Sequence, residues 1–264
     1  MTDHPSYPNF RGKHAHDAFF SPQNFVDYRR RLGRLPPFPT PEGIIFCYQR
    51  SLYEHVLSTH DVTPAGGFAG EFALLADTGG RIGLSGNFGI GAPVVTILLE
   101  EFAAFGVRRF VSIGTAGALA RDLRIGDVVV CGRAIRDEGV SHHYLPPAKY
   151  ADASPILTDR LERALRDAGT APVRGTTWTI DTPYREIVAE ARHYQQEGVL
   201  TVEMEAAALF AVAQYRGVDL ASAVTISDSL ADLVWDPQFH ATPTQSGLER
   251  LFRAAVETLL DDPS

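Results

Sequence analysis

The chain has 264 residues, of which 45% are hydrophobic, and its formal net charge is −8. This length suits one α/β domain, and the hydrophobic content is sufficient for a buried core. The negative charge is spread along the chain, which argues against a nucleic-acid-binding protein, because such a protein needs a basic stripe. Two cysteines, Cys47 and Cys131, lie in apolar runs and cannot build a disulfide framework, so we expect buried thiols in a reducing compartment.

Residues 1–41 are predicted to form an N-terminal arm, and residues 42–264 a single domain. The arm starts with a polar segment that lacks the apolar stretch of a signal peptide. The most apolar helical stretch of the chain contains Glu100 and Glu101, which argues against a membrane span. We therefore expect a cytoplasmic protein whose arm wraps its own domain or packs on a neighbouring subunit.

Hydrophobic periodicity and turn residues predict an alternation of strands and helices without internal repeats. The predicted strands are 43–48, 72–75, 81–85, 110–113, 126–131, 176–180 and 221–226. The predicted helices are 94–105, 154–168, 206–215 and a final one that includes 248–259. Strands and helices that intermix without a break in composition indicate one α/β domain.

Two glycine-containing segments follow predicted strands. The first, GNFGIGAP at 86–93, resembles a dinucleotide-binding loop only superficially, because Val94 stands where Gly or Ala is needed. A turn that exposes backbone N–H groups to an anion or a sugar fits it better. The second, a loop at 114–117, carries the hydroxyl of Thr115 between small residues that let a ligand approach the backbone. A tight junction between strand and turn would use the same glycines.

Two further patterns do not meet the requirements of a metal site or a nucleophile elbow. His142 and His143 are adjacent, so they point apart on an extended chain and make a poor metal pair. Ser85 lies in a sequence that resembles the nucleophile elbow G-x-S-x-G, but Asn87 replaces the closing glycine. We predict no metal site and no cofactor.

Three carboxylates are the main candidates for a functional site. Glu203 and Glu205 come directly before a helix-forming run, and a strand predicted at 221–226 delivers Ser227 and Asp228 at its carboxyl end. In open α/β sheets, small ligands bind at the carboxyl ends of strands. Alternatively, the two glutamates only complement the helix dipole and the aspartate only caps the next turn. The spacing alone leaves both interpretations open.

Six segments between Arg81 and Asp228 resemble motifs of the nucleoside phosphorylase superfamily and occur in the family's order. They are GNFGIGAP, FVSIGTAGAL, LRIGDVVV, AIRDEGVSHHY, TWTIDTPY and VEMEAAALF with the terminal SD. This superfamily includes purine nucleoside phosphorylases of the hexameric type, uridine phosphorylases and methylthioadenosine nucleosidases. The resemblance implies a central mixed and partly closed β-sheet surrounded by helices, and a homo-oligomer.

The resemblance also implies a substrate site. Glu205 would hold the 2′ and 3′ hydroxyls of a ribose, with Met204 packed against the sugar and Glu203 near the base or sugar. Tyr184 would lie by the base or sugar. Further residues expected in the substrate site are Ala116, Gly117, Trp178 and Ser227.

The implied reaction breaks an N-glycosidic bond. Asp228 would be the general acid at purine N7, which corresponds to about 10²–10⁴-fold in rate, or roughly 3–5 kcal/mol of barrier. Thr115 would touch the phosphate or the attacking oxygen, and Gly91 and Arg50 are the other candidates for the phosphate or water site. Phosphate is expected as co-substrate.

The chain departs from the family at the phosphate. Phosphorylases carry an arginine three residues before the position of Thr115, and this chain has Ser112 there. It also lacks the family's G-D-P-x-R turn after the first strand, where Arg50 is the candidate substitute. Hydrolytic members lack the same arginine and use water.

Three functions are therefore weighed. The first is phosphorolysis of a nucleoside to free base and pentose 1-phosphate, with a purine favoured because no Gln/Arg pair for a pyrimidine is evident. The alternative is a nucleosidase that hydrolyses the same bond. A non-catalytic nucleoside-binding protein is the third, and the presence of Asp228 argues against it, because binding alone needs no proton donor.

Overall fold

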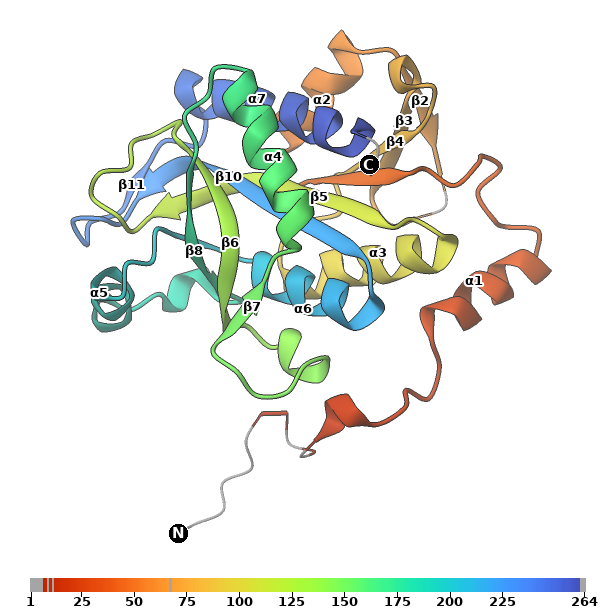
Figure 1. Cartoon of the computed structure of the whole chain (residues 1–264), viewed down its shortest axis with the longest axis horizontal. Coiled ribbons are helices and arrows are strands. Elements are labelled where there is room, and N and C mark those ends of the chain that lie inside the picture. The colour runs from red at the N-terminus through yellow and green to blue at the C-terminus, as the bar shows by residue number, and fades with distance from the viewer. Residues whose placement is uncertain (1–6, 9, 11, 67, 262–264) are drawn as a thin grey trace.

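A mixed β-sheet runs through the centre of the molecule, with helices on both of its faces (Figure 1). The computed structural model describes residues 7, 8, 10, 12–66 and 68–261. Its α-helices are α1 (Pro22–Arg31), α2 (Arg50–Thr59), α3 (Ala92–Phe105), α4 (Pro155–Asp167), α5 (Val188–Gln196), α6 (Ala206–Arg216) and α7 (Thr242–Leu260). Its 3₁₀ helices are η1 (Lys13–Ala15), η2 (Ala76–Thr78), η3 (Ser141–His143) and η4 (Pro183–Arg185).

The sheet formed by the described residues has 11 strands. They are β1 (Gly43–Cys47), β2 (Val62–Ala65), β3 (Glu71–Leu75), β4 (Ile82–Gly86), β5 (Arg109–Ala118), β6 (Val128–Asp137), β7 (Tyr150–Asp152), β8 (Val173–Ile180), β9 (Thr201–Glu203), β10 (Asp219–Ser229) and β11 (Asp236–Pro237). The order is β11-β10-β6-β8-β9-β5-β1-β4-β3-β2, with β7 beside β6.

One extra pairing closes part of this sheet. β10 pairs with β5 as well as with β6, so that β5, β10, β6, β8 and β9 form a closed ring of strands. β1, β4, β3 and β2 extend from β5 as an open sheet of parallel and antiparallel pairs, whereas β7 and β11 pair with β6 and β10. The expectation of one α/β domain with a mixed, partly closed sheet surrounded by helices is confirmed.

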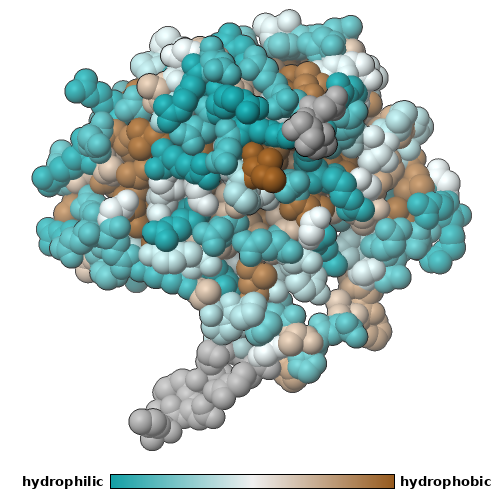
Figure 2. Space-filling view, viewed as in Figure 1, coloured by the Kyte–Doolittle hydropathy of each residue, from teal (hydrophilic) through white to brown (hydrophobic). Residues whose placement is uncertain are grey.

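The two faces of the sheet have separate hydrophobic cores. α2, α4 and α7 cover one face, and α3 and α6 cover the other (Figure 1). α4 shows why its sequence folds this way, since Leu157, Leu161 and Leu165 recur at helical spacing and are all buried. α6 is buried from Ala206 to Ala213, and its alanines let it pack closely between the sheet and α3. Figure 2 shows one side of the molecular surface, which is mainly hydrophilic and has hydrophobic side chains in separate spots.

The N-terminal segment contacts its own domain at several places. α1 packs beside α3 with Val26 buried, and η1 lies against η3. There, Lys13 Nζ lies 2.9 Å from His143 Nδ1, and the hydroxyl of Tyr7 lies 2.8 Å from His143 Nε2. The division at residue 41 stays a prediction, and residues 1–6, 9 and 11 of the arm lie outside the described residues.

Several elements differ from the sequence-based predictions. The segment 114–117, predicted as a loop, continues β5 to Ala118, because β10 and β9 both pair with it. α2 and α5 were not predicted, and Glu203 ends the short strand β9 and does not begin a helix. In the described part of the chain, no helix combines the length and apolarity needed to cross a membrane.

Candidate active site

The strands that carry two of the predicted carboxylates, Glu203 and Asp228, pair with β5 near its carboxyl end, at Gly117 and the residue after it. The strand register places Val202 of β9 on one side of Gly117 and Asp228 of β10 on the other. A Cβ atom at this glycine would lie 2.5 Å from Leu230 Cδ1 and 3.1 Å from Asp228 Oδ2, so only glycine allows this approach. Glu203 follows Val202 directly, and the turn into α6 then brings in Glu205.

Glu203 is held by donors of its own chain. It is 8% exposed, and its Oε1 accepts a hydrogen bond of 2.5 Å from the Thr179 hydroxyl. Its Oε2 accepts the backbone N–H groups of Glu205, at 2.8 Å, and Ala206, at 2.7 Å. Burial raises the pKa of this carboxyl, and these hydrogen bonds oppose the rise. Glu203 therefore fixes the turn from β9 into α6.

Glu205 occupies the N-cap position of α6 and is 7% exposed. Its Oε1 accepts a 2.5 Å hydrogen bond from the backbone N–H of Gly91. Gly91 has φ +101°, a conformation that favours glycine, and it precedes α3. Burial raises the pKa of Glu205, and the charge of Glu203 raises it further. A buried carboxylate with a raised pKa beside a strand end is typical of a functional site.

Asp228 lies at a bulge near the carboxyl end of β10. The register with β5 shifts between Ile226 and Asp228, and such bulges often re-aim side chains beside active sites. Ser227 Oγ donates to Asp228 Oδ1 at 2.7 Å, and Trp235 Nε1 donates to Oδ2 at 3.1 Å. Burial raises the pKa of Asp228, while these two donors oppose the rise. The net effect favours a carboxyl group that can carry a proton nearer neutral pH than an exposed aspartate does.

The segment after η4 adds a further carboxyl that the sequence analysis did not select. Burial, followed by the charges of Asp228 and Glu190, raises the pKa of Glu186 to about 7. Glu186 is thus electrostatically coupled to Asp228. Tyr184, two residues earlier, is 99% exposed in this chain, and its predicted contact with the base or sugar stays a prediction.

Four uncharged residues lie just after the carboxyl end of β1 and within β5. Gln49 Nε2 donates to Thr115 Oγ1 at 3.0 Å, and the hydroxyls of Tyr48 and Ser112 are 2.9 Å apart. The Tyr48 ring lies against Gly114, where a Cβ atom would be 3.0 Å from it. We call Tyr48, Gln49, Ser112 and Thr115 the neutral cluster. Tyr48 thus fills space beside Ser112, at the position where the family resemblance expects an arginine.

Two predicted site residues are placed away from these groups. The side chain of Arg50 is 77% exposed and forms a 2.7 Å ion pair with Glu54, one turn along α2. It points to solvent, and the structure does not bring it to Thr115. Trp178 is fully buried and donates to Asp137 Oδ2 at 2.9 Å. Trp178 therefore packs in the core and offers no exposed surface to a ligand, because both faces of β8 are covered where it lies.

The other predicted residues lie where the sequence places them, on the elements that meet at Gly117. Ala116 precedes it on β5 and is 4% exposed, Ser227 is fully buried, and Met204 is partly exposed between the two glutamates. Sequence reasoning missed three neighbours: Gln49, Glu186 and Trp235. Gln49 follows the carboxyl end of a predicted strand, as Asp228 does, and this position was the signal that could have found it.

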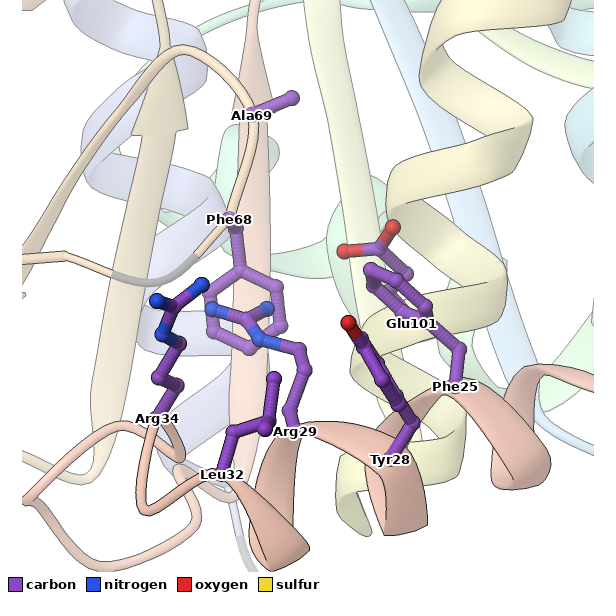
Figure 3. Close-up of a pocket in the computed structure, with 8 residues that line it drawn as sticks. All are labelled: Phe25, Tyr28, Arg29, Leu32, Arg34, Phe68, Ala69 and Glu101. Atoms are coloured by element: carbon purple, nitrogen blue, oxygen red, sulfur yellow. The ribbon is translucent and has the colours of Figure 1, made fainter.

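Two cavities lie elsewhere on the described surface. One, of about 440 Å³, lies between α1, α3 and the segment around Phe68, and Figure 3 shows Arg29 beside the Phe68 ring, at 5.9 Å from its centroid. The other, of about 400 Å³, is lined by Leu119, Ala120, Arg121, Arg192, Gln195 and Gln196. Neither cavity is lined by Glu203, Glu205 or Asp228. The candidate site is therefore identified by its buried carboxyl groups and not by the volume of a cavity.

Comparison with known proteins shows the family of this chain. The phosphorylase superfamily matches residues 56–259. A protein named purine nucleoside phosphorylase, DeoD-type, from Bacillus cytotoxicus is 32% identical over 182 residues, which cover 67% of this chain and 74% of that protein. One of the same name from Caldanaerobacter subterraneus is 31% identical over 187 residues, covering 68% and 76% respectively. The chain therefore belongs to the phosphorylase superfamily and is an enzyme of the nucleoside phosphorylase type.

Proposed function

We propose that this protein cleaves the N-glycosidic bond of a purine nucleoside with phosphate, giving the free base and a pentose 1-phosphate. The observation that carries the proposal is the pair of buried carboxyl groups, Asp228 on β10 beside Gly117 and Glu205 at the start of α6, just after β9. The purine is supported by the relatives, which are named purine nucleoside phosphorylases. Nucleoside and phosphate are the substrates, and we expect a cytoplasmic homo-oligomer.

Asp228 is proposed as the general acid for the leaving base. Breaking the bond develops negative charge on the purine, which a proton delivered to N7 neutralises. Burial raises the pKa of Asp228 and so increases the fraction of the carboxyl that holds this proton near neutral pH. Ser227 and Trp235 each donate to one carboxylate oxygen and so hold the group in one orientation.

Glu205 is proposed as the residue that binds the sugar. A carboxylate can accept from two hydroxyl donors, as required by the 2′ and 3′ hydroxyls of a ribose. The N–H of Gly91 fixes Oε1, and the partly exposed Met204 lies beside it in the chain to contact the sugar. Glu203 has a supporting role, because its two oxygens hold Thr179 and the start of α6.

Thr115 is proposed as a contact for the attacking group. It lies on β5 two residues before Gly117, so an oxygen bound there would approach the sugar from the side of β1. A second candidate function is hydrolysis of the same bond by water. It is favoured by the uncharged nature of the neutral cluster, since Ser112 stands in place of the arginine and Arg50 points to solvent.

The test is base release from adenosine, inosine and guanosine, with and without phosphate, with the Asp228→Asn variant as negative control. We expect release that requires phosphate and yields ribose 1-phosphate. Release that is indifferent to phosphate and yields free ribose would establish hydrolysis instead. Absence of release from all three nucleosides under both conditions would overturn the proposal.

A further inference from the structure

Gln49, at the carboxyl end of β1, has a side-chain oxygen with no use in the fold. We propose that Gln49 positions the attacking nucleophile by accepting a hydrogen bond from its O–H group. This inference rests on the proposed function, because it concerns the group that attacks the sugar. If Gln49 has this role, the site prefers nucleophiles that carry a proton on oxygen.

The position of Gln49 is fixed by its backbone and by one end of its side chain. Gln49 is the N-cap residue of α2, and its carbonyl accepts the N–H of Tyr53 at 3.1 Å. β1 and β5 are parallel neighbours, paired up to Cys47 and Ile113, so Gln49 lies beside the continuation of β5. There, its Nε2 donates to Thr115 Oγ1 at 3.0 Å.

The other end of this carboxamide is left without a partner. Gln49 Oε1 is buried, and no group in the described part of the chain donates to it. A buried acceptor without a hydrogen bond costs free energy, so a native protein retains one where something else satisfies it. The side chains that share this property are mostly hydroxyls, which can rotate toward a neighbour: Ser85, Thr158, Thr170 and Thr225. A carboxamide that pairs with Thr115 through one end still leaves its other end without a partner.

The groups that pack and hydrogen-bond around this oxygen are uncharged. The nearest backbone on β5 is Gly114, where an added Cβ atom would be 3.7 Å from Oε1. The hydrogen-bonded neighbours are the hydroxyls of the neutral cluster. Burial, and then the charge of Glu205, raises the pKa of Tyr48, so the charge that acts on the neutral cluster is negative.

These conditions select the chemistry of the ligand. An acceptor oxygen needs a donor, so the bound group must carry an O–H. Hydrogen phosphate and water both satisfy this requirement, whereas sulfate at neutral pH has no proton to donate. The shared chemistry is an oxygen nucleophile with at least one O–H, and the arms of the experiment separate phosphate from water.

The experiment compares wild type with Gln49→Met, which keeps the chain length without an acceptor, and Gln49→Glu, which keeps acceptor oxygens and adds negative charge. The matched control is Gln214→Met, which removes an exposed carboxamide that donates to the Asp152 carbonyl on another face. Initial rates of base release are measured over phosphate and over nucleoside concentration. Melting temperatures confirm that each variant is folded and report its stabilisation by phosphate and by sulfate.

We expect Gln49→Met to raise the KM for phosphate about 3- to 10-fold, because one hydrogen bond to phosphate is lost. The KM for nucleoside should be unchanged. Gln49→Glu should raise the KM for phosphate more than about 10-fold, because a carboxylate repels a phosphate anion at short range. In the phosphate-free arm, any hydrolysis should fall with Gln49→Met and persist with Gln49→Glu. Phosphate should stabilise the wild-type protein against heating, and sulfate should neither stabilise it nor inhibit it.

The inference is overturned if folded Gln49→Met has the wild-type KM for phosphate and the wild-type rate with water, or if sulfate competes with phosphate in the wild-type protein. Since base release would persist in either case, the proposed function would stand. A wild-type protein that neither releases base nor is stabilised by phosphate would overturn both. If neither variant folds, the comparison of phosphate with sulfate on the wild-type protein still decides the question.

Discussion

The two sides of the candidate site are built from opposite chemistry. On the side of β9 and β10, the buried Glu203, Glu205 and Asp228 all have raised pKa values because burial disfavours their charge. On the side of β1 and β5, the neutral cluster consists of hydroxyls and a carboxamide. We infer from this difference that the carboxyl groups beside β9 and β10 transfer the proton and bind the sugar. The nucleophile must then be held beside β1 and β5 by hydrogen bonds alone.

A second contrast lies within the carboxylates. The oxygens of Glu203 receive donors from Thr179 and from the start of α6, so its charge is used by the fold. Glu205 accepts the backbone N–H of Gly91, with a smaller contribution from the backbone of Met204, and lies under the added charge of Glu203, so its burial is a cost that a ligand would offset. The same substitution should therefore have opposite effects on stability at these two positions.

The largest effect is expected for Asp228→Asn. An amide cannot deliver a proton to the departing purine, so kcat should fall about 10²–10⁴-fold, the usual contribution of a general acid. Steady-state rates of base release measure this effect, with circular dichroism as the control for folding. A loss of less than about tenfold would remove Asp228 from its role as acid.

Glu205→Gln should lower kcat/KM for a ribonucleoside by about 10- to 100-fold, because charge-assisted hydrogen bonds to the sugar are lost. The 2′-deoxynucleoside should lose less, since one of its hydroxyl partners is already missing. Rates with matched ribo- and deoxyribonucleosides test this difference. Equal losses for both sugars would contradict the assignment of Glu205 to the diol.

The same variant tests the stability of the site. Because the folded pKa of Glu205 is raised above its ordinary value of 4.5, its contribution to stability is fully present below that value and is lost as pH rises through the raised pKa. Glu205→Gln should therefore be more stable than wild type at pH 8, by about 0.5–2 kcal/mol, and gain little at pH 4. Urea unfolding at the two pH values measures this, and a destabilised variant at pH 8 would contradict it.

Glu203→Gln should be destabilised by about 1–3 kcal/mol at neutral pH, because its new NH₂ group faces donors in place of an acceptor. Urea unfolding of both variants at pH 7 compares their free energies of unfolding directly. If the two variants changed stability in the same direction, the distinction between a structural and a functional glutamate would fail.

The smallest effect is expected for Trp235→Phe. Trp235 donates to Asp228 Oδ2 and so favours the charged carboxylate. Its removal should raise the pKa of Asp228 further, which moves the alkaline limb of the pH–rate profile to higher pH, with a change in rate of about two- to threefold at neutral pH. A shift of that limb to lower pH would show that Trp235 does not act on Asp228.

Much of this architecture follows from local sequence. Strands with buried apolar runs and helices with regular apolar spacing were predictable, and the order of six motifs indicated the family. The site depends on register, which local patterns do not contain. Thr115 and Gly117 look like loop residues until β10 and β9 are known to pair with β5.

The predicted site residues that lie apart from the others are explained by the same limit of local patterns. A tryptophan in a strand buried on both sides has the same spacing as one that faces a ligand, so Trp178 was not identified as a core residue. Arg50 follows a strand end, but helix α2 begins there and turns its side chain toward Glu54. Gln49 becomes meaningful only when the orphaned oxygen is seen beside Thr115.

The most direct test of the central claim is a crystal structure of the Asp228→Asn variant with inosine and phosphate bound. The account predicts that Glu205 lies within hydrogen-bond distance of both the 2′ and 3′ hydroxyls. It also predicts residue 228 at N7 of the base and the phosphate beside Thr115 and Gln49. A nucleoside bound in another cavity, or one whose sugar does not contact Glu205, would contradict it.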